Sequence, residues 1–388
     1  MVTQSSVPQQ REALSSLAFF GGGTGGHLFP AIAIAERAVE RFPGCRVLFV
    51  RTGRPVEDRV FSDLPYETRV WSLSAPGRAP GGWARYLWRA RLAAKEARTW
   101  LRQGDGFDVV FGLGGYVSLP GVLAARAEGI AALLLEQNRV AGRVNRLLAP
   151  WADAVLCSYA DTRLRFGRRV EVTGNPVRRD VLAAARRRAE TRVGDRRAGL
   201  RTVLVMGGSQ GSRAINRAIC TALPELRDLH SKIRWIHLAG PADKETVKDA
   251  YRKNSWDAEV IEFTDRLPYL VARSDLVLAR SGGTTVSELA VLGVPAILIP
   301  YPHHRDGHQV ANAQALVEAG GAQLLAEEDL SSSSLRRLFT DVLFSPQRLS
   351  AMARGALGLA RPRAADAVLD LAVELRNKRC RSGSVSSS

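Results

Sequence analysis

The stretch Leu17-Ala-Phe-Phe-Gly-Gly-Gly-Thr-Gly-Gly-His27 runs from an apolar segment through a glycine turn into the apolar-periodic residues 29–38. This order predicts a buried strand, a tight turn and a helix. Residues 202–211, Thr-Val-Leu-Val-Met-Gly-Gly-Ser-Gln-Gly, repeat the pattern, with a predicted helix at residues 214–223. A glycine turn lets the backbone approach a ligand closely and points helix N–H groups at negative charge. Two copies predict an α/β fold with two Rossmann-like domains facing each other across a cleft.

The composition fits a protein with two packed cores. The chain has 388 residues, of which 46% are hydrophobic. No apolar run approaches the roughly 20 residues that a membrane-spanning helix needs. Residues 1–16 are polar and lack the charged-then-apolar layout of a signal peptide. The four cysteines are far apart without a C-x-x-C pair, so we expect reduced cytosolic thiols rather than a disulfide or zinc framework.

The formal net charge of +17 suits three kinds of partner: nucleic acid, an anionic membrane surface or acidic substrates. The sequence contains no helix-turn-helix, RNA-binding sheet motif or zinc finger pattern. We therefore expect no nucleic acid partner.

Alternating strand and helix signals divide the chain into segments. Gly174-Asn-Pro176 ends regular structure and separates the two domains. The predicted segments are a disordered tail at residues 1–16, domains at 17–176 and 177–362, a terminal helix at 363–376 that packs back on the first domain, and a disordered, Ser-rich tail at 377–388. The predicted strands after the first glycine turn are residues 46–50, 108–111, 130–135, 154–157 and 170–173, and in the second domain 202–206, 233–238, 260–263, 276–278 and 296–299.

The segment Arg280-Ser-Gly-Gly-Thr-Thr-Val-Ser-Glu288 follows a predicted strand and opens a helix. Small and hydroxyl residues there leave N–H groups and threonine hydroxyls for a phosphate or diphosphate. Glu288, about one turn further on, can accept two hydrogen bonds from a ribose diol. A capped helix with Glu288 as its first-turn acid is the alternative. Polar residues 301–312 follow the end of the next strand, where open α/β sheets bind ligands, and this favours a nucleotide site.

Several further motifs accompany these two regions. They are G-G-T-G-G-H at 22–27, G-G-Y at 114–116, E-Q-N at 136–138, G-N-P-V-R at 174–178, G-G-S-Q-G at 207–211, and R-S-G-G-T-T-V-S-E at 280–288 with Gln309 and Asn312. Together they resemble the UDP-N-acetylglucosamine:N-acetylmuramyl-(pentapeptide) pyrophosphoryl-undecaprenol N-acetylglucosamine transferase family, which makes lipid II from lipid I. The resemblance runs from about residue 19 to residue 375. Leu135 departs from it, since the family often has His at this position.

The resemblance implies a glycosyltransferase B fold with UDP-GlcNAc in the C-terminal domain and the lipid acceptor in the N-terminal, membrane-facing domain. It assigns the ribose to Glu288 and the uracil to backbone near Thr264. The other donor-site residues that it implies are Gly283, Thr284 and Thr285 at the diphosphate, Arg178 and Ser209 closing around the phosphates, Gln309 at the GlcNAc hydroxyls, and Thr24, Gly25, Gly26 and Asn138 from the opposite domain.

The implied reaction is an inverting displacement, in which the 4-hydroxyl of the muramyl sugar attacks the anomeric carbon of GlcNAc and UDP leaves. Such a step needs a base at the hydroxyl. His27 is our candidate, because a helix N-terminus disfavours imidazolium. Its alternatives are a capping role or binding of the acceptor diphosphate, and Glu136 is the second candidate base.

The sequence contains no Asp-x-Asp motif, so we expect neither a metal nor another cofactor at the donor site. Three histidines crowd one loop, at His303, His304 and His308, and a metal cluster there is the alternative.

Residues 83–92 combine aromatic side chains with arginines at helical spacing. Trp83, Tyr86 and Leu87 share a face, and Trp88 lies beside it, so we expect these four, with Tyr116, on the acceptor and membrane side. The alternative is a core-packing helix with a solvated basic face. The expected location is peripheral, at the cytoplasmic face of the bacterial plasma membrane.

Three other functions remain open from the sequence. A diacylglycerol glycosyltransferase would use the same donor motifs with another lipid. A UDP-GlcNAc 2-epimerase would share the twin domains and the nucleotide without a lipid acceptor. The third is a nucleotide-sugar binding protein without catalysis.

Overall fold

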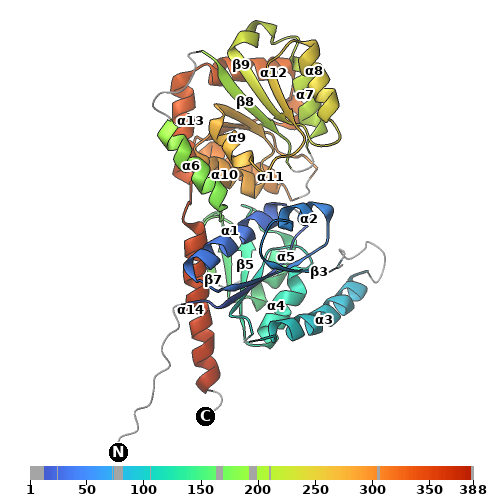
Figure 1. The fold of residues 1–388 in the computed structure, drawn as a ribbon, viewed down its shortest axis with the longest axis vertical. Helices are drawn as coiled ribbons and strands as arrows, with labels where there is room; N and C mark the ends of the chain where they lie inside the picture. The colour runs from blue at the N-terminus through green and yellow to red at the C-terminus, as the bar shows by residue number, and fades with distance from the viewer. Residues whose placement is uncertain are drawn as a thin grey trace, which may run out of the picture.

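The computed structural model describes residues 13–23, 25–71, 73, 82–104, 106–162, 169–191, 199–208, 211–303 and 306–385. Within these residues, two parallel sheets of seven and six strands form two lobes stacked along the long axis of the molecule (Figure 1). This confirms the predicted fold class. A parallel strand that is buried on both faces reads as a continuous apolar run, as in residues 131–135.

The N-terminal sheet has the strand order β3-β2-β1-β4-β5-β6-β7. Strand β1 pairs in register with β2 at Ser16 and Arg46, and with β4 at Leu17 and Val109. The strands are β1 (Ser16–Phe20), β2 (Arg46–Arg51), β3 (Glu67–Val70), β4 (Val109–Gly112), β5 (Ala131–Glu136), β6 (Ala154–Cys157) and β7 (Arg169–Val172). The helices of this lobe are α1 (Gly25–Arg41), α2 (Pro55–Phe61), α3 (Gly82–Leu101), α4 (Ser118–Ala127) and α5 (Arg143–Leu148), followed by a 3₁₀ turn at Ala149–Trp151.

The C-terminal sheet has the order β10-β9-β8-β11-β12-β13. Its strands are β8 (Arg201–Met206), β9 (Ile233–Leu238), β10 (Ala258–Ile261), β11 (Leu276–Ala279), β12 (Ala296–Leu298) and β13 (Ala322–Leu324). The helices are α6 (Arg179–Thr191), α7 (Arg213–Ala222), α8 (Lys244–Lys253), α9 (Leu267–Arg273), α10 (Gly283–Leu292), α11 (His308–Glu318), α12 (Ser332–Leu338) and α13 (Pro346–Leu359), with short 3₁₀ or π segments at Arg227–Lys232, Glu327–Asp329 and Phe339–Leu343. The edge strands β3 and β13 were not predicted, and β10 begins two residues before its predicted position.

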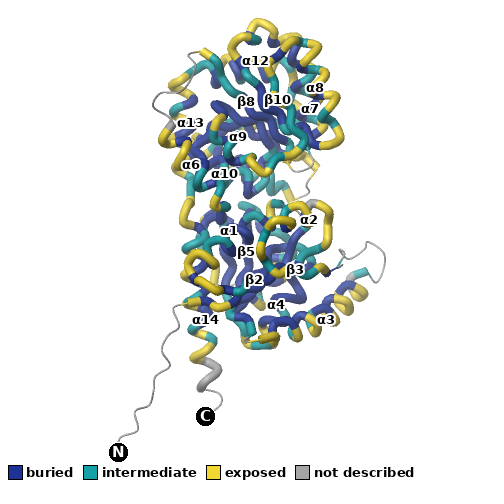
Figure 2. The backbone as a smooth tube through the Cα atoms, in the orientation of Figure 1, coloured by how far each residue is buried: buried dark blue, intermediate teal, exposed yellow. Residues whose placement is uncertain are grey.

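The central strands of each sheet are buried on both faces, and their successive residues point to opposite sides. In β1, Leu17 and Phe19 enter one core and Ala18 and Phe20 enter the other. Phe19 stacks on Phe49 and Phe111 in the neighbouring strands, with ring centroids 4.8 and 4.9 Å apart. Buried residues therefore follow the strands in both lobes (Figure 2).

Helix α14 (Ala364–Val385) follows α13 of the C-terminal lobe and runs down the N-terminal lobe beside α1 (Figure 1). Val368, Leu369 and Ala372 are fully buried in the N-terminal core. The predicted disordered tail at 377–388 is wrong in extent, since the helix continues to Val385. One contact along this extension is the ion pair of Arg379 Nη2 with Asp153 Oδ1, at 2.6 Å.

The predicted N-terminal tail also extends too far into the domain. Leu14 is buried in the core, and Ser16 already pairs with Arg46 in the sheet. Burial of the Leu14 side chain explains why order begins before Leu17.

Candidate active site

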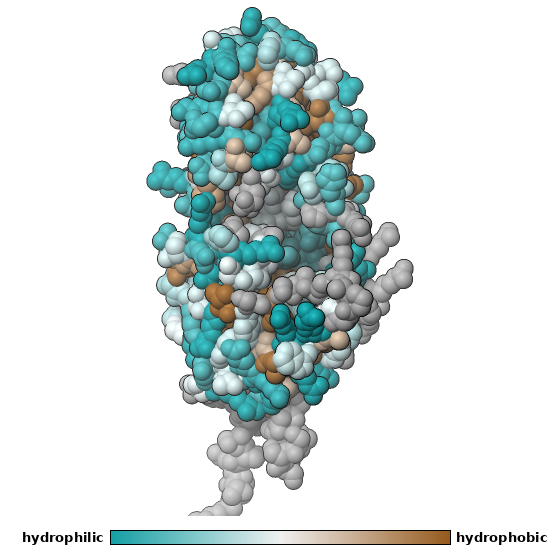
Figure 3. Space-filling model, turned by 90° about the vertical axis from the view of Figure 1, so that its right-hand side faces the viewer, coloured by the Kyte–Doolittle hydropathy of each residue, from teal (hydrophilic) through white to brown (hydrophobic). Residues whose placement is uncertain are grey.

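The carboxyl ends of the two sheets face a cavity of about 1150 Å³ between the lobes. In the space-filling view, the surface between the lobes is recessed (Figure 3). His27 and Glu136 reach this cavity from the N-terminal lobe, and Arg178, Glu288 and Gln309 reach it from the C-terminal side. The structure thus brings the predicted base candidates and the predicted donor residues to one cleft, as expected for ligands at strand ends.

His27 stands in the first turn of α1, directly after the first glycine turn. Its imidazole hydrogen-bonds the backbone of Gly22, which means that the ring N–H donates to the Gly22 carbonyl. Burial lowers the pKa of His27 below its ordinary value, and nearby His308 acts in the same direction, while the bond to Gly22 opposes them. A neutral imidazole carries one ring proton and has the chemistry to accept a second.

Glu136 ends strand β5, and its carboxylate accepts four hydrogen bonds. Oε1 accepts from the backbone N–H of Asn138 at 3.0 Å and from its side-chain amide at 3.3 Å. Oε2 accepts from the N–H of Gly142 and the side-chain amide of Asn145, both at 2.8 Å. Burial raises the pKa of Glu136, and these bonds oppose that shift. The donors fill the acceptor positions of the carboxylate, so the geometry favours a structural role over the predicted basic one.

Helix α10 begins at Gly283 and carries Glu288 on the side of the cavity. Oε1 of Glu288 is buried and has no hydrogen-bond partner among the described residues. The nearest cation is Arg178, whose Nη2 lies 3.8 Å from this oxygen. Burial raises the pKa of Glu288 to about 7; Arg178 opposes the shift and Asp180 adds to it. A buried carboxylate oxygen without a donor, at a cavity wall, needs hydroxyl donors from a ligand.

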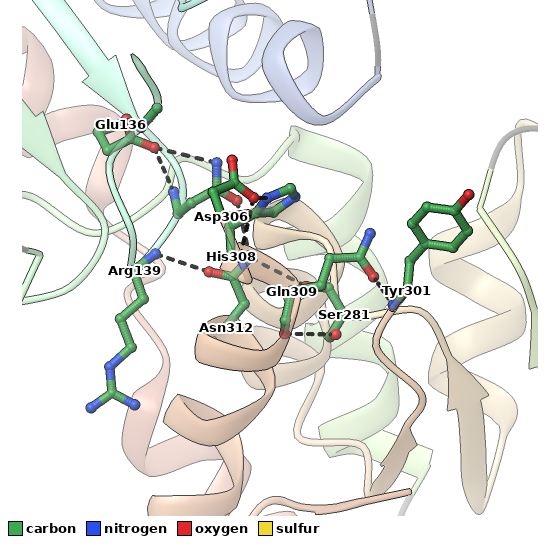
Figure 4. A network of polar contacts seen from close by, with 10 residues as sticks. Glu136, Arg139, Ser281, Tyr301, Asp306, His308, Gln309 and Asn312 are labelled. Carbon is green, nitrogen blue, oxygen red and sulfur yellow. Dashed lines mark hydrogen bonds and ion pairs between the residues drawn. The ribbon is translucent and has the colours of Figure 1, made fainter. Parts of the chain in front are cut away.

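Four contacts join the lobes at the base of the cleft. The Asn312 side-chain amide donates to Asn138 Oδ1 at 3.0 Å, and Asn312 Oδ1 accepts from the N–H of Arg139 at 2.9 Å (Figure 4). The Thr284 hydroxyl donates to the Gly26 carbonyl at 2.9 Å. A Cβ at Gly283 would lie 2.4 Å from the Gln137 carbonyl oxygen, so the close approach requires glycine.

These contacts engage two of the predicted donor residues, whose donor roles stay predictions. The hydroxyl of Thr284 is not free for a phosphate, because its proton is donated to Gly26. The side chain of Asn138 bonds Asn312 and Glu136, and the residue also lines the cavity. Gly282, Gly283 and Thr285 at the start of α10 line the cavity, and a helix start favours negative charge.

Comparisons with known proteins decide the family. Residues 17–157 match the glycosyltransferase family 28 N-terminal domain, and residues 202–368 match the glycosyltransferase family 28 C-terminal domain. The UDP-N-acetylglucosamine–N-acetylmuramyl-(pentapeptide) pyrophosphoryl-undecaprenol N-acetylglucosamine transferase of Anaeromyxobacter dehalogenans (strain 2CP-C) is 39% identical over 363 residues, which cover 92% of each chain. The crystal structure of Acinetobacter baumannii MurG matches with a TM-score of 0.73 and 29% identity, covering 92% of this chain and 99% of that one. The chain belongs to the MurG family.

Membership of the MurG family confirms the predicted enzyme class, an N-acetylglucosamine transferase. A UDP-GlcNAc 2-epimerase from Neisseria meningitidis, bound to UDP-GlcNAc, also matches with a TM-score of 0.62, covering 92% of this chain and 100% of that one. Its identity is only 15%, so this likeness shows the shared fold alone. Both enzymes share this fold, so the fold does not distinguish a transferase from an epimerase. The sequence identity to MurG proteins is what favours the transferase over the epimerase.

The remaining predicted donor residues of this MurG-family chain lie around the same cavity. Gly25, Gly26, Thr264 and Thr285 line it. Gln309 Oε1 accepts from the N–H of Tyr301 at 2.9 Å, so its amide nitrogen is the group that can face a sugar hydroxyl (Figure 4). Predicted residues Thr24 and Ser209 lie outside the described residues.

Among the described residues of this MurG-family chain, no group of three His, Cys, Asp or Glu residues is placed to hold a metal ion. Nδ1 of His308 pairs instead with Asp306 Oδ1 at 2.6 Å. The ring of His303 packs edge-on against Tyr301. His304 lies outside the described residues.

Helix α3 corrects one prediction for the acceptor side. Tyr86 is only 4% exposed, and its hydroxyl donates to the carbonyl of Tyr116 at 2.9 Å, so it belongs to the core. Leu87 and Trp88 are 53% and 62% exposed, and Leu92 next to them is 45% exposed. The side chain of Trp83 lies outside the described residues. Among the helices that the structure describes, none is long and apolar enough to cross a bilayer.

Sequence reasoning missed two residues that shape the cleft. Asn312 was noted only as part of a motif, and its bonds to the opposite lobe depend on tertiary structure. Glu57 was not singled out at all, although its buried carboxylate bonds the first glycine turn. Its one sequence signal is an acid three residues after a turn, at the start of a helix.

Proposed function

We propose that this chain moves GlcNAc from UDP-GlcNAc to the 4-hydroxyl of the muramyl sugar of undecaprenyl-pyrophosphoryl-MurNAc-pentapeptide, which converts lipid I into lipid II. The observation that carries the site assignment is the unpartnered Oε1 of Glu288 across the cleft from the neutral, oriented imidazole of His27. The carboxylate holds the ribose diol, and the imidazole faces the acceptor hydroxyl.

The reaction is a single displacement with inversion. The His27 imidazole takes the proton of the 4-hydroxyl while that hydroxyl oxygen forms the new bond to the anomeric carbon. The bond from that carbon to the diphosphate oxygen breaks, and UDP leaves with the electron pair. Backbone N–H groups at the start of α10 and the guanidinium of Arg178 stabilise the charge on the departing diphosphate.

Glu136 orients the loop that joins the lobes rather than taking a proton. Its four donors hold Asn138 and Gly142, and Asn138 in turn bonds Asn312 of the opposite lobe. A carboxylate in this setting rigidifies the cleft, because removing it leaves buried donors without partners.

The experiment that tests the function is transfer of radiolabelled GlcNAc from UDP-GlcNAc to a short-chain lipid I analogue, with diacylglycerol as the second acceptor. Product from the lipid I analogue alone is the expected result. Product from diacylglycerol alone would mean that the acceptor is diacylglycerol and not lipid I, while the assignment of the donor site would stand. If UDP-GlcNAc binds and neither acceptor reacts, the epimerase or binding-protein hypothesis takes precedence.

The exposed side chains Leu87, Trp88 and Leu92 of α3 form the membrane-docking surface, where the enzyme meets the cytoplasmic leaflet. Arg85, Arg89 and Arg91 are exposed on the same helix. Apolar side chains among arginines suit the boundary between acyl chains and anionic headgroups. The enzyme is therefore peripheral and reaches its lipid-linked acceptor from this side.

Vesicle sedimentation tests this surface. Combined substitution Leu87→Ser and Trp88→Ser should reduce binding to vesicles with anionic phospholipid by roughly tenfold or more, since each side chain contributes about 1.5–3 kcal/mol when fully buried. Leu357→Ser, which alters an exposed leucine (46%) of the C-terminal lobe, is the matched control. Equal binding of all three proteins would place the membrane contact elsewhere.

A further inference from the structure

Glu57 on α2 is surrounded by donors and has no exposed surface. Oε1 accepts from the N–H of Gly23 at 2.6 Å and from the hydroxyl of Thr52 at 2.8 Å. Oε2 accepts from the N–H groups of Gly53 at 2.6 Å and Arg54 at 3.1 Å. Four donors fill this carboxylate, so it has no capacity left for a substrate.

The two oxygens of Glu57 serve different purposes. Oε2 caps the start of α2, as an acid three residues into a helix commonly does. Oε1 reaches back 34 residues to the first glycine turn, which a helix cap does not require. Gly22 allows this approach, because a Cβ there would lie 2.3 Å from Oε1. The guanidinium of Arg54 adds a bond from Nη1 to the Gly23 carbonyl at 3.1 Å.

One peptide unit connects Glu57 with His27. The N–H of the Gly22–Gly23 peptide donates to Glu57, and the carbonyl of the same peptide accepts from the His27 imidazole. Hydrogen bonds at both ends of an amide polarise it in the same sense and strengthen each other. The carboxylate therefore acts on the ring without touching it.

We propose that Glu57 is a positioning residue for His27, which acts through the Gly22–Gly23 peptide; the proposal rests on His27 as the base of the proposed function. The bond to the Gly22 carbonyl holds the proton on one ring nitrogen and fixes the orientation of the ring. The negative charge of Glu57 strengthens that carbonyl as an acceptor and so favours the imidazolium that forms in the transition state.

The test measures ring tautomer and turnover in the same proteins. With ¹⁵N-labelled histidine, the His27 signals, assigned by their loss in His27→Gln, should show one tautomer in the wild type and a mixture in Glu57→Gln. The kcat of Glu57→Gln should fall about tenfold or more, with the KM for UDP-GlcNAc unchanged. Asp58→Asn, which removes the neighbouring, mostly exposed carboxylate, should leave both readouts as in the wild type.

Two further variants separate positioning from loss of structure. Gly22→Ala keeps the charge of Glu57 but displaces its carboxylate from the turn, so it should give the same tautomer mixture if Glu57→Gln fails to fold. In a His27→Ala background, Glu57→Gln should lower kcat no further, because both changes remove one function.

The outcomes distinguish this proposal from the base assignment. A single tautomer and unchanged kcat in Glu57→Gln, with His27→Ala inactive, would overturn the positioning role and keep the base. Full turnover in His27→Ala would overturn the base, while the tautomer readout would still decide whether Glu57 orients the ring. A further loss from Glu57→Gln in the His27→Ala background would reduce Glu57 to a structural role.

Discussion

Helices α1 and α10 both begin after glycine residues and both direct their N-termini into the cleft, but they are equipped differently. Helix α10 carries its ligand group, Glu288, on the helix itself. The turn before α1 is held from outside by Glu57 and Arg54 and presents one titratable group, His27. On the proposed assignments, Glu288 and the start of α10 form the main donor segment, helped by residues such as Arg178 and Gln309, whereas His27 depends on contacts between residues far apart in sequence. Substitutions should therefore separate binding from turnover.

The largest separation is expected from His27→Ala. Loss of a general base typically lowers kcat by about 10²–10⁴-fold, and the donor Kd should stay unchanged because His27 is not among the proposed donor ligands. Calorimetry with UDP and single-turnover kinetics measure the two effects. His230→Ala, a histidine of the C-terminal lobe that does not line the cavity, is the control. Wild-type turnover in His27→Ala would leave His27 a capping or diphosphate-binding role.

Glu288→Ala should give the opposite pattern. Removing two hydrogen bonds to a charged group costs roughly 1.5–3 kcal/mol each, so the UDP-GlcNAc Kd should rise by at least about 10-fold, with a smaller effect on kcat at saturating donor. Titration calorimetry measures the Kd. Glu245→Ala removes another first-turn acid in the same lobe and should not alter it. An unchanged Kd in Glu288→Ala would reduce Glu288 to a helix-start acid.

A smaller effect is expected from pH at the α10 end of the cleft. Glu288, with a pKa of about 7, is partly protonated in the free protein, and a ribose diol donates better to the ionised form. Protons therefore compete with the ligand, and affinity should fall as pH drops through 7, by up to about tenfold per pH unit. Uridine is the probe, because it carries no titrating phosphate. The charged groups that face Glu288 are Arg178 and Asp180. A flat profile from pH 8 to 6, or the same slope in Glu288→Gln, would contradict this assignment.

The order of elements could be predicted because it depends on local patterns. Apolar runs such as residues 131–135 and the turn at Gly21–Gly26 act through neighbours in sequence, and the structure has a strand and a helix start there. The face of α3 could not be predicted from spacing, since a helical period shows which residues share a side but not which side meets the core. Tyr86 was placed on the wrong side for this reason.

The residues of the candidate site also differ in whether local sequence could predict them. Glu288 could be predicted as a ligand group because strand, glycines, hydroxyls and acid lie within thirteen consecutive residues, 276–288. Glu57 could not, because its partner Gly23 is 34 residues away and only folding brings them together. Asn138 and Thr284 read as ligand groups in sequence, but in the structure their side chains bond across the lobes.

The smallest predicted effect concerns the direct contact between the two helix starts. Thr284→Val keeps the shape of the side chain and removes the hydrogen bond to the Gly26 carbonyl. A neutral bond contributes about 0.5–1.5 kcal/mol, so kcat/KM should fall roughly 2- to 10-fold. The loss should divide between kcat and donor KM, because the bond links the turn that carries His27 to the helix that carries Glu288. Thr285→Val, which alters the next residue without breaking a bond between the lobes, is the comparison. A loss confined to the donor Kd in both variants would mean that Thr284 acts as a phosphate ligand after all, and that the two helix starts are independent.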